Sequence, residues 1–495
     1  MKQRFPDHFY NPVTLAGAII ASLSFILILF LMILDLMSGE ANPYMGIITF
    51  IVMPGALIFG LILIAYGIIR ERRRKARGIE RKKFPVIDLN DPRYRLSFTI
   101  FIIGTVLLLF FSAFGSYKAY EYTETDSFCG ELCHEPMEPE YTAYLTSPHS
   151  RVGCVQCHIG AGADWFVKSK ISGAYQVYSV LFNKFSRPIP TPIEDLRPAQ
   201  GTCEQCHWPR HFFSEKKARF DYYISDEKNT HSSVSMLLKI GGGNSEFGTT
   251  EGIHWHMNIA NTIYYYPSDH SRQNIPWVKM ISKESGEEVI YTSEEFNPAD
   301  FDSASVRLMD CIDCHNRPSH IFNQPDKMMN LYIANGSIDS TLPFIKSLGV
   351  SVLEKSYSAK AAALDSIRIS VEEFYRLNYP EISRHKSDNI NKAIGMIIKI
   401  YQRNYFPEMN VSWKKYANNI GHVWDPGCFR CHDGNHKSKD GRVISKDCNI
   451  CHTIIEQTTI DGKTQVNLAG LDFEHPVNVG LSIDDMICMD CHARN

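Results

Sequence analysis

Seven short cysteine–histidine motifs constrain this chain more than any other feature of its sequence. Six have the form C-x-x-C-H, and the first, CGELCH, has one extra residue between its cysteines. C-x-x-C-H is the attachment sequence of c-type haem, in which both thiols bond to the porphyrin and the histidine is an axial iron ligand. The motifs are Cys129/Cys133/His134, Cys154/Cys157/His158, Cys203/Cys206/His207, Cys311/Cys314/His315, Cys428/Cys431/His432, Cys448/Cys451/His452 and Cys488/Cys491/His492.

The cysteine count supports this interpretation. The chain has 14 cysteines and the motifs use all of them, so no thiol remains for a disulfide or a nucleophile. Zinc sites are the alternative, because C-x-x-C pairs also bind zinc. Such pairs need no histidine directly after the second cysteine, however, and here every motif has one. The sequence therefore predicts seven covalently bound haem c groups, which would supply much of the apolar interior.

Three apolar runs precede the first motif, at residues 13–34, 45–69 and 96–115. Each is long enough to cross a bilayer as a helix, which takes about 20 residues. The loop at 70–95 holds 11 Lys and Arg residues, whereas the loop at 35–44 holds none. The positive-inside rule places the basic loop in the cytoplasm and the motifs on the opposite side. We therefore expect a multi-pass protein of the bacterial inner (cytoplasmic) membrane with a periplasmic haem domain.

Changes in composition divide the chain into five segments. Residues 1–95 hold two transmembrane helices and the basic loop, and residues 96–116 hold the third helix. Residues 117–210 form a trihaem domain. Residues 211–310 are an insertion in which two alternating runs, 277–282 and 289–293, predict a β-hairpin. Residues 311–495 carry four motifs around a helical insertion at 318–427. The predicted fold class is mainly α, loop-rich and multihaem, with three transmembrane helices and a small β-hairpin.

Histidines outside the motifs are candidates for the second axial ligand of each iron. His8 is expected on the cytoplasmic side, and His385 lies in a polar, lysine-containing stretch that is expected at the surface. Ten candidates remain, of which His149, His254, His256, His422, His436 and His475 are preferred and His211, His231, His270 and His320 complete the set. The sequence does not pair them with particular irons. In the first motif, His134 and Met137 are equal candidates for the proximal ligand, and methionine would raise the reduction potential.

The segment from Phe128 to His207 resembles the NapC/NirT family of membrane-anchored multihaem quinol dehydrogenases. The resemblance rests on FCGELCHEPMEPEYTAYLTSPHS, VGCVQCHIGAGADWFVKSKISG and RPIPTPIEDLRPAQGTCEQCHWP, together with the apolar run before them. The whole architecture is similar to the larger heptahaem inner-membrane cytochromes of metal-reducing bacteria. The resemblance implies that the protein oxidises menaquinol near the first haem. Electrons would then pass along the haem chain to a periplasmic cytochrome or reductase in anaerobic respiration.

The resemblance also implies a quinol site. The family has a lysine after the second motif, and Lys168 and Lys170 occupy that place. Gln176 stands near the position of a family aspartate. The first motif departs from the commonest family pattern, which is C-x-x-C-H with a methionine two residues later. Because quinol oxidation releases protons, Glu135 and Glu138 are alternative proton acceptors. Snorkelling toward lipid headgroups is the alternative role for the two lysines.

Two other functions remain open at this level. About 290 residues and four motifs follow the family-like segment, which is compatible with a terminal reductase that acts at an open haem. A passive electron conduit fed by another subunit is the third hypothesis. Residues after 96 carry a net charge of −9, so a soluble partner would need a basic docking patch. The basic loop is interpreted as a topological anchor and not as a nucleic-acid site. Oligomerisation is left open.

Overall fold

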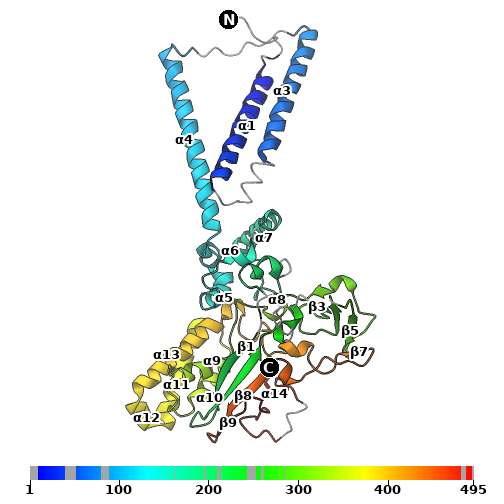
Figure 1. Cartoon of the computed structure of the whole chain (residues 1–495). Helices are drawn as coiled ribbons and strands as arrows, with labels where there is room; N and C mark the ends of the chain where they lie inside the picture. The colour runs from blue at the N-terminus through cyan, green and yellow to red at the C-terminus, as the bar shows by residue number, and fades with distance from the viewer. Residues whose placement is uncertain are drawn as a thin grey trace. The chain divides into compact units, whose positions relative to one another are not determined.

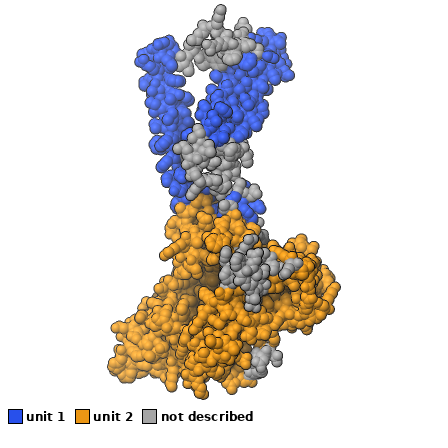
Figure 2. All heavy atoms as spheres, viewed as in Figure 1, with its two compact units in different colours: residues 1–123, 159–174 blue, residues 124–158, 175–495 orange. Residues whose placement is uncertain are grey.

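The computed structural model describes residues 9, 11–38, 52–79, 88–160, 162–193, 197–208, 212, 214–241, 252–257, 261–283, 285–480 and 486–492. The chain divides into two compact units (Figure 2). The first contains Met1–Thr123 and Ile159–Ala174, and the second contains Glu124–His158 and Tyr175–Asn495. All seven motifs fall in the second unit.

The first unit contains three helices long and apolar enough to span a membrane, α1 (Pro12–Ser38), α3 (Met53–Ala76) and α4 (Pro92–Thr123). Small residues allow α1 and α3 to pack closely: a Cβ on Gly17 would lie 2.7 Å from the Gly60 carbonyl oxygen. These helices confirm the predicted membrane-length segments. Residues 45–51 of the second predicted span lie outside the described residues, and α4 extends beyond the predicted third span at both ends.

A cluster of helices forms the apolar core of the second unit (Figure 1). It consists of α9 (Pro325–Ala334), α10 (Ile345–Glu354), α11 (Lys360–Asn378), α12 (Pro380–His385) and α13 (Ser387–Asn404). Ile367, Val371 and Tyr375 repeat at four-residue spacing along α11 and are fully buried. The three- and four-residue periodicity at 366–377 and 389–403 therefore predicted α11 and α13 correctly.

Two antiparallel sheets complete the second unit. One has the strand order β1 (Glu215–Tyr223), β2 (His231–Lys239), β8 (His452–Thr458) and β9 (Thr464–Val466). The other has the order β6 (Arg307–Leu308), β3 (Asn261–Tyr266), β4 (Trp277–Ser282), β5 (Glu288–Thr292) and β7 (Lys437–Ser438). The predicted hairpin is β4–β5, in which Val278 pairs with Tyr291.

The prediction of a single small hairpin understated the β content. The hairpin is the middle of a five-stranded sheet, and the four-stranded sheet was not predicted. β1 begins with Glu215, Lys216 and Lys217, so it lacks the alternation of apolar and polar residues that marks a strand. Its neighbour β2 also pairs with β8, which lies more than 200 residues further along the chain.

Short helical segments carry the motifs and the loops between them. They are η3 (Phe128–Leu132), α5 (His134–Leu145), α6 (Cys154–His158), α7 (Ala163–Leu181), η4 (Ala199–Gly201), η5 (Cys203–Gln205), η7 (Ile253–Met257), η8 (Ser303–Ser305), α8 (Cys311–Cys314), η9 (Pro407–Met409), η10 (Gly427–Arg430), η11 (Cys448–Ile450) and α14 (Met489–His492).

Candidate functional site

Each motif forms a short helical turn that sets its two cysteines and its histidine close together. In the fourth motif, Asp310 caps α8 by accepting the Ile312 N–H at 2.8 Å. In the sixth motif, Asp447 caps η11 by accepting the Asn449 N–H at 2.9 Å. An aspartate directly before the first cysteine is a favourable helix cap. In four motifs the histidine N–H also donates to the first cysteine's carbonyl, at 2.8–3.0 Å: His207–Cys203, His315–Cys311, His432–Cys428 and His492–Cys488.

The motif thiols lie at or near the surface of the polypeptide, and none of the 14 is buried in it. Five thiols are exposed and nine are half-buried in the polypeptide. The exposed ones are Cys157, Cys206, Cys314, Cys448 and Cys491. Cys491 lies on α14 near the C-terminal end of the chain, yet its N–H donates to the Cys488 carbonyl oxygen at 3.3 Å. The last motif therefore forms a helical turn of the same kind as the others.

The imidazole of every C-x-x-C-H motif faces the imidazole of a histidine outside the motifs. Ring centroids are 6.1 Å apart in one pair, 6.2 Å in three, 6.3 Å in one and 5.6 Å in one. The pairs are His158–His320, His207–His149, His315–His254, His432–His256, His452–His422 and His492–His475.

This spacing fits an iron held between two imidazoles. A metal–imidazole bond is about 2.0 Å long and each nitrogen lies about 1.1 Å from its ring centre, so two opposed ligands have centroids about 6.2 Å apart. Five of the six pairs match that separation. The sixth, His256–His432, is tighter, with its Nε2 atoms 3.4 Å apart. The six motif turns and their partner histidines could therefore each hold one haem.

Hydrogen bonds orient most of the partner histidines. Nδ1 faces a backbone carbonyl oxygen in five of them, at 2.8–3.4 Å. The contacts are His149–Pro318, His254–Ile240, His256–Ile253, His320–Glu140 and His475–Val477. A histidine that binds a metal through one ring nitrogen usually donates the other N–H to such an oxygen, which fixes both the tautomer and the ring orientation.

Burial keeps many of these rings neutral. It lowers the pKa of His158, His254, His256, His315, His320, His422 and His452, and that of His256 falls to about 4. Neutral imidazole is the form that binds a metal ion. The sites are thus prepared for ligation near neutral pH.

Among the described residues, the remaining candidates have other surroundings. His231 Nε2 lies 2.7 Å from Asp221, and His270 is exposed. His436 is almost completely buried, with Nδ1 2.9 Å from Asp433 and Nε2 2.7 Å from the Ile275 carbonyl oxygen. Both of its nitrogens are therefore engaged by the protein. His8 and His211 lie outside the described residues, and His385 lies on the surface as expected.

The first motif is built differently. His134 is exposed and has no imidazole partner among the described residues, and Met137 is half-buried on the first turn of α5. The extra residue of this motif is accommodated in η3, where a Cβ on Gly130 would overlap the Tyr141 ring.

Thiols of successive motifs lie near one another, in the order of the sequence. A hydrogen bond with Cys129, and then burial, raises the pKa of Cys154. Burial raises the pKa of five other motif thiols, and a thiol of the neighbouring motif raises each further. These neighbours are Cys157–Cys206, Cys311–Cys203, Cys314–Cys428, Cys451–Cys428 and Cys488–Cys448. The seven motifs thus form one continuous series from the first to the last.

The residues suggested for the quinol site are divided between the two units. Lys170 Nζ lies 5.4 Å from the Tyr120 ring centre and 3.5 Å from Thr123 Oγ1, at the end of α4. Lys168 Nζ lies 4.8 Å from the ring centre of Trp165. In the second unit, Glu135 pairs with Arg187 at 2.7 Å, Glu138 pairs with Lys360 at 2.6 Å, and Gln176 is exposed on α7.

Three apolar helices and a series of cysteine–histidine motifs define a membrane-anchored multihaem c-type cytochrome that functions in electron transfer. The N-terminal region of the NapC/NirT cytochrome c family matches residues 91–190. The chain is also 41% identical to the cytochrome c-type protein ImcH of Geobacter sulfurreducens, over 98% of this chain and 95% of that protein. The protein belongs to the NapC/NirT cytochrome c family. No solved structure matches it.

Proposed function

We propose that this cytochrome binds seven haem c groups, oxidises menaquinol at the periplasmic face of the bacterial inner membrane and delivers the electrons to a periplasmic acceptor. The carrying observation is the continuous series of motifs, six of which have an opposed histidine pair. Haem c, when bound, supplies a one-electron couple whose potential depends on its axial ligands and its burial. Neighbouring sites along one series would let electrons pass from each to the next.

The protein's own residues have separate roles in this proposal. The motif cysteines would attach the haems, and the six histidine pairs would be their axial ligands. The carbonyl contacts to Nδ1 hold five of the partner rings in place, which limits reorganisation when an electron arrives. We place the reacting molecule at the first motif, because this motif directly follows the third membrane-length helix in the sequence.

Membrane-level features favour quinol as that reacting molecule. Lys170 lies against Tyr120 and Thr123, where the third membrane-length helix ends. Oxidation of a quinol to a quinone releases two electrons and two protons, so the site needs groups that accept protons as well as an electron acceptor. We assign quinol binding to Lys170, with Lys168 as a second candidate, and proton acceptance to Glu135 or Glu138. Gln176 is a further polar candidate.

A terminal reductase is the second candidate, and the first motif favours it too. The first motif differs from the other six by its extra residue, and a haem held there could bind a small oxidant such as a nitrogen oxyanion. A passive conduit fed by another subunit is the third possibility. The three functions differ in what reduces and what reoxidises the protein, which makes them separable in one experiment.

The test mixes the purified, lipid-embedded protein anaerobically with a menaquinol analogue and follows the haem α-band. We expect rapid reduction, slowed at least about tenfold by Lys170→Gln. Lys184→Gln is the matched control, because Lys184 also lies over a tyrosine ring, 4.9 Å from the ring centre of Tyr178. No reduction by quinol in a protein that dithionite fully reduces would contradict quinol oxidation and favour the conduit. Rapid reoxidation by nitrite would favour the reductase.

A further inference from the structure

Two charged residues stand between the cysteines of adjacent motifs. Asp313 lies in the fourth motif, CIDCH, and Arg430 lies in the fifth, CFRCH. Asp313 is only 4% exposed. Neither residue is an attachment point or an axial ligand, so haem attachment alone gives no reason for a charge at these positions.

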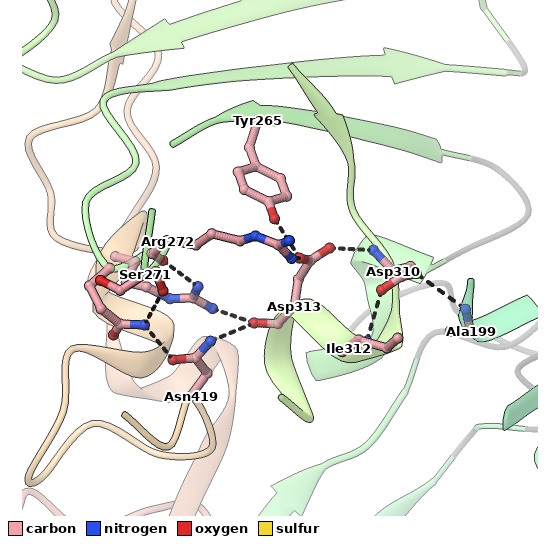
Figure 3. A network of polar contacts seen from close by, with 10 residues as sticks. Ala199, Tyr265, Ser271, Arg272, Asp310, Ile312, Asp313 and Asn419 are labelled. Atoms are coloured by element: carbon pink, nitrogen blue, oxygen red, sulfur yellow. Dashed lines mark hydrogen bonds and ion pairs between the residues drawn. The ribbon is translucent and has the colours of Figure 1, made fainter. Parts of the chain in front are cut away.

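Polar groups from several elements converge on Asp313 (Figure 3). Its carboxylate accepts hydrogen bonds from the Tyr265 hydroxyl and from the Asp310 N–H, the latter at 2.8 Å. Arg272 Nη1 lies 3.4 Å from the same carboxylate and forms an ion pair with it. Asn419 donates to the Asp313 carbonyl oxygen at 2.9 Å. The fourth motif is therefore fixed from the sheet, from its own turn and from the segment before the fifth motif.

Arg430 ties the fifth motif to this network. Its Nη2 donates to the Asp313 carbonyl oxygen at 2.7 Å, and its Nη1 donates to the Arg272 carbonyl oxygen at 2.9 Å. Its Nε donates to the Gly427 carbonyl oxygen at 2.9 Å. A guanidinium presents these donors in one rigid plane, so a single side chain fixes the spacing between the two motifs.

The charge of Arg430 is not neutralised by these contacts. Its three partners are carbonyl oxygens, and no carboxylate among the described residues lies within ion-pair distance of it, whereas Asp313 is already paired with Arg272. The charge lies close to both motifs, because Arg430 stands between the cysteines of the fifth motif and donates to the Asp313 carbonyl oxygen, between the cysteines of the fourth.

We propose that Arg430 is a positioning residue that couples the fourth and fifth haem sites, holding them at a fixed spacing and favouring the reduced form of both. The inference rests on the proposed function, in which electrons pass between these sites. Reduction adds a negative charge, and a fixed positive charge in a poorly solvated environment stabilises the reduced form. If the reduced form is stabilised similarly at both sites, an electron meets little difference in free energy when it passes from one to the other.

The test is an anaerobic spectroelectrochemical titration of the full-length, haem-loaded protein carrying Arg430→Gln. We expect two haems to become harder to reduce, each by about tenfold in its reduction equilibrium, or about 59 mV for a one-electron couple. Arg442→Gln is the matched control. Arg442 is an exposed arginine of the same region that is paired with Glu287 and Asp440, and its loss is expected to leave the titration unchanged.

A second variant separates charge from general damage. Arg430→Lys keeps the charge but loses the planar donor group, so we expect wild-type potentials and slower electron exchange between the sites. Wild-type potentials in Arg430→Gln, or an equal shift in Arg442→Gln, would overturn the proposal. If Arg430→Gln does not retain its haems, a shifted potential in Arg430→Lys would overturn it.

The electrode supplies the electrons in this titration, so the measured potentials do not depend on whether the protein oxidises quinol. A wild-type protein with fewer than seven haems would instead contradict the proposed function.

Discussion

The Nε2 atoms of His256 and His432 face each other 3.4 Å apart, although 176 positions separate the two residues in the sequence. The same turn, η7, also carries His254, whose ring lies parallel to that of His315 at a centroid distance of 6.3 Å. One short segment thus supplies a partner to the fourth motif and another to the fifth. The segment lies between β2 and β3, which belong to different sheets, so the positions of both histidines depend on the folding of both sheets.

Substitution of the two histidines of η7 should affect different haems. His254→Ala removes the partner of His315, and His256→Ala removes the partner of His432. In each variant we expect one haem to change from a low-spin to a high-spin signal, because one strong axial ligand is lost. Electron paramagnetic resonance of the oxidised protein measures this change. His270→Ala, which removes an exposed histidine, is expected to leave the spectrum unchanged, and the absence of a high-spin signal in either η7 variant would contradict the pairing.

Local chemistry explains what the sequence could predict. Haem attachment depends on two thiols and an imidazole within five or six residues, and membrane spanning depends on the length of an apolar run. Both are properties of a continuous segment, and so are the α11 and α13 helices with their apolar stripes. The motifs and the membrane-length helices can therefore be located from the order of the residues alone.

The histidine pairs depend on tertiary folding and could not be predicted in the same way. His320 follows the fourth motif by five residues, yet it faces His158 of the second. His436 follows the fifth motif by four residues, but its nitrogens bind Asp433 and Ile275. Proximity in the sequence was therefore a poor guide to the contacts that His320 and His436 make. Asp313 and Arg430 stand between the cysteines of their motifs, but so do Glu204 and Asp490, so a charge there did not by itself predict the network between two motifs.

Removal of the Tyr265 hydroxyl should destabilise the second unit. Tyr265→Phe deletes a donor to the buried Asp313 carboxylate, and an unsatisfied buried group typically costs about 1–3 kcal/mol. We expect a lower Tm, measured by circular dichroism on the haem-loaded protein. Tyr266→Phe is the control: its hydroxyl donates to the Asp300 carbonyl oxygen at 2.7 Å in an exposed position, where water can replace it. Equal losses for the two variants would argue against a special role for Asp313.

Enlargement of Gly130 should disturb the first motif selectively. A Cβ at this position overlaps the Tyr141 ring, so Gly130→Ala must displace that ring or η3. We expect incomplete haem attachment at the first motif, measured as the haem-to-protein ratio and as the haem content of the peptide containing Cys129. Gly395→Ala is the control, because nothing lies within 4 Å of its added Cβ and alanine favours the α13 helix by about 1 kcal/mol. Full attachment in Gly130→Ala would show that the turn tolerates the displacement.

The buried His436 should make stability depend on pH. Burial lowers its pKa, but hydrogen bonds with Asp433 and Ile275 outweigh that effect, and the pKa is raised above its ordinary value. Both ring nitrogens face acceptors, so only the protonated imidazole can donate to both. Because the folded pKa exceeds the unfolded one, the stabilisation is complete below about pH 6.5 and is lost as the pH rises through the folded pKa.

His436→Gln should therefore lower Tm more at about pH 5.5 than at about pH 8, since only the wild-type protein carries the extra charge-assisted hydrogen bond at the lower pH. Thermal denaturation of both proteins at the two pH values measures the difference. His385→Gln is the matched control, because His385 is exposed on α12 and its loss should leave Tm nearly unchanged at either pH. A difference in Tm between wild type and His436→Gln that is the same at both pH values would mean that the neutral ring stabilises the fold equally well. The contribution of His436 would then be packing and not charge.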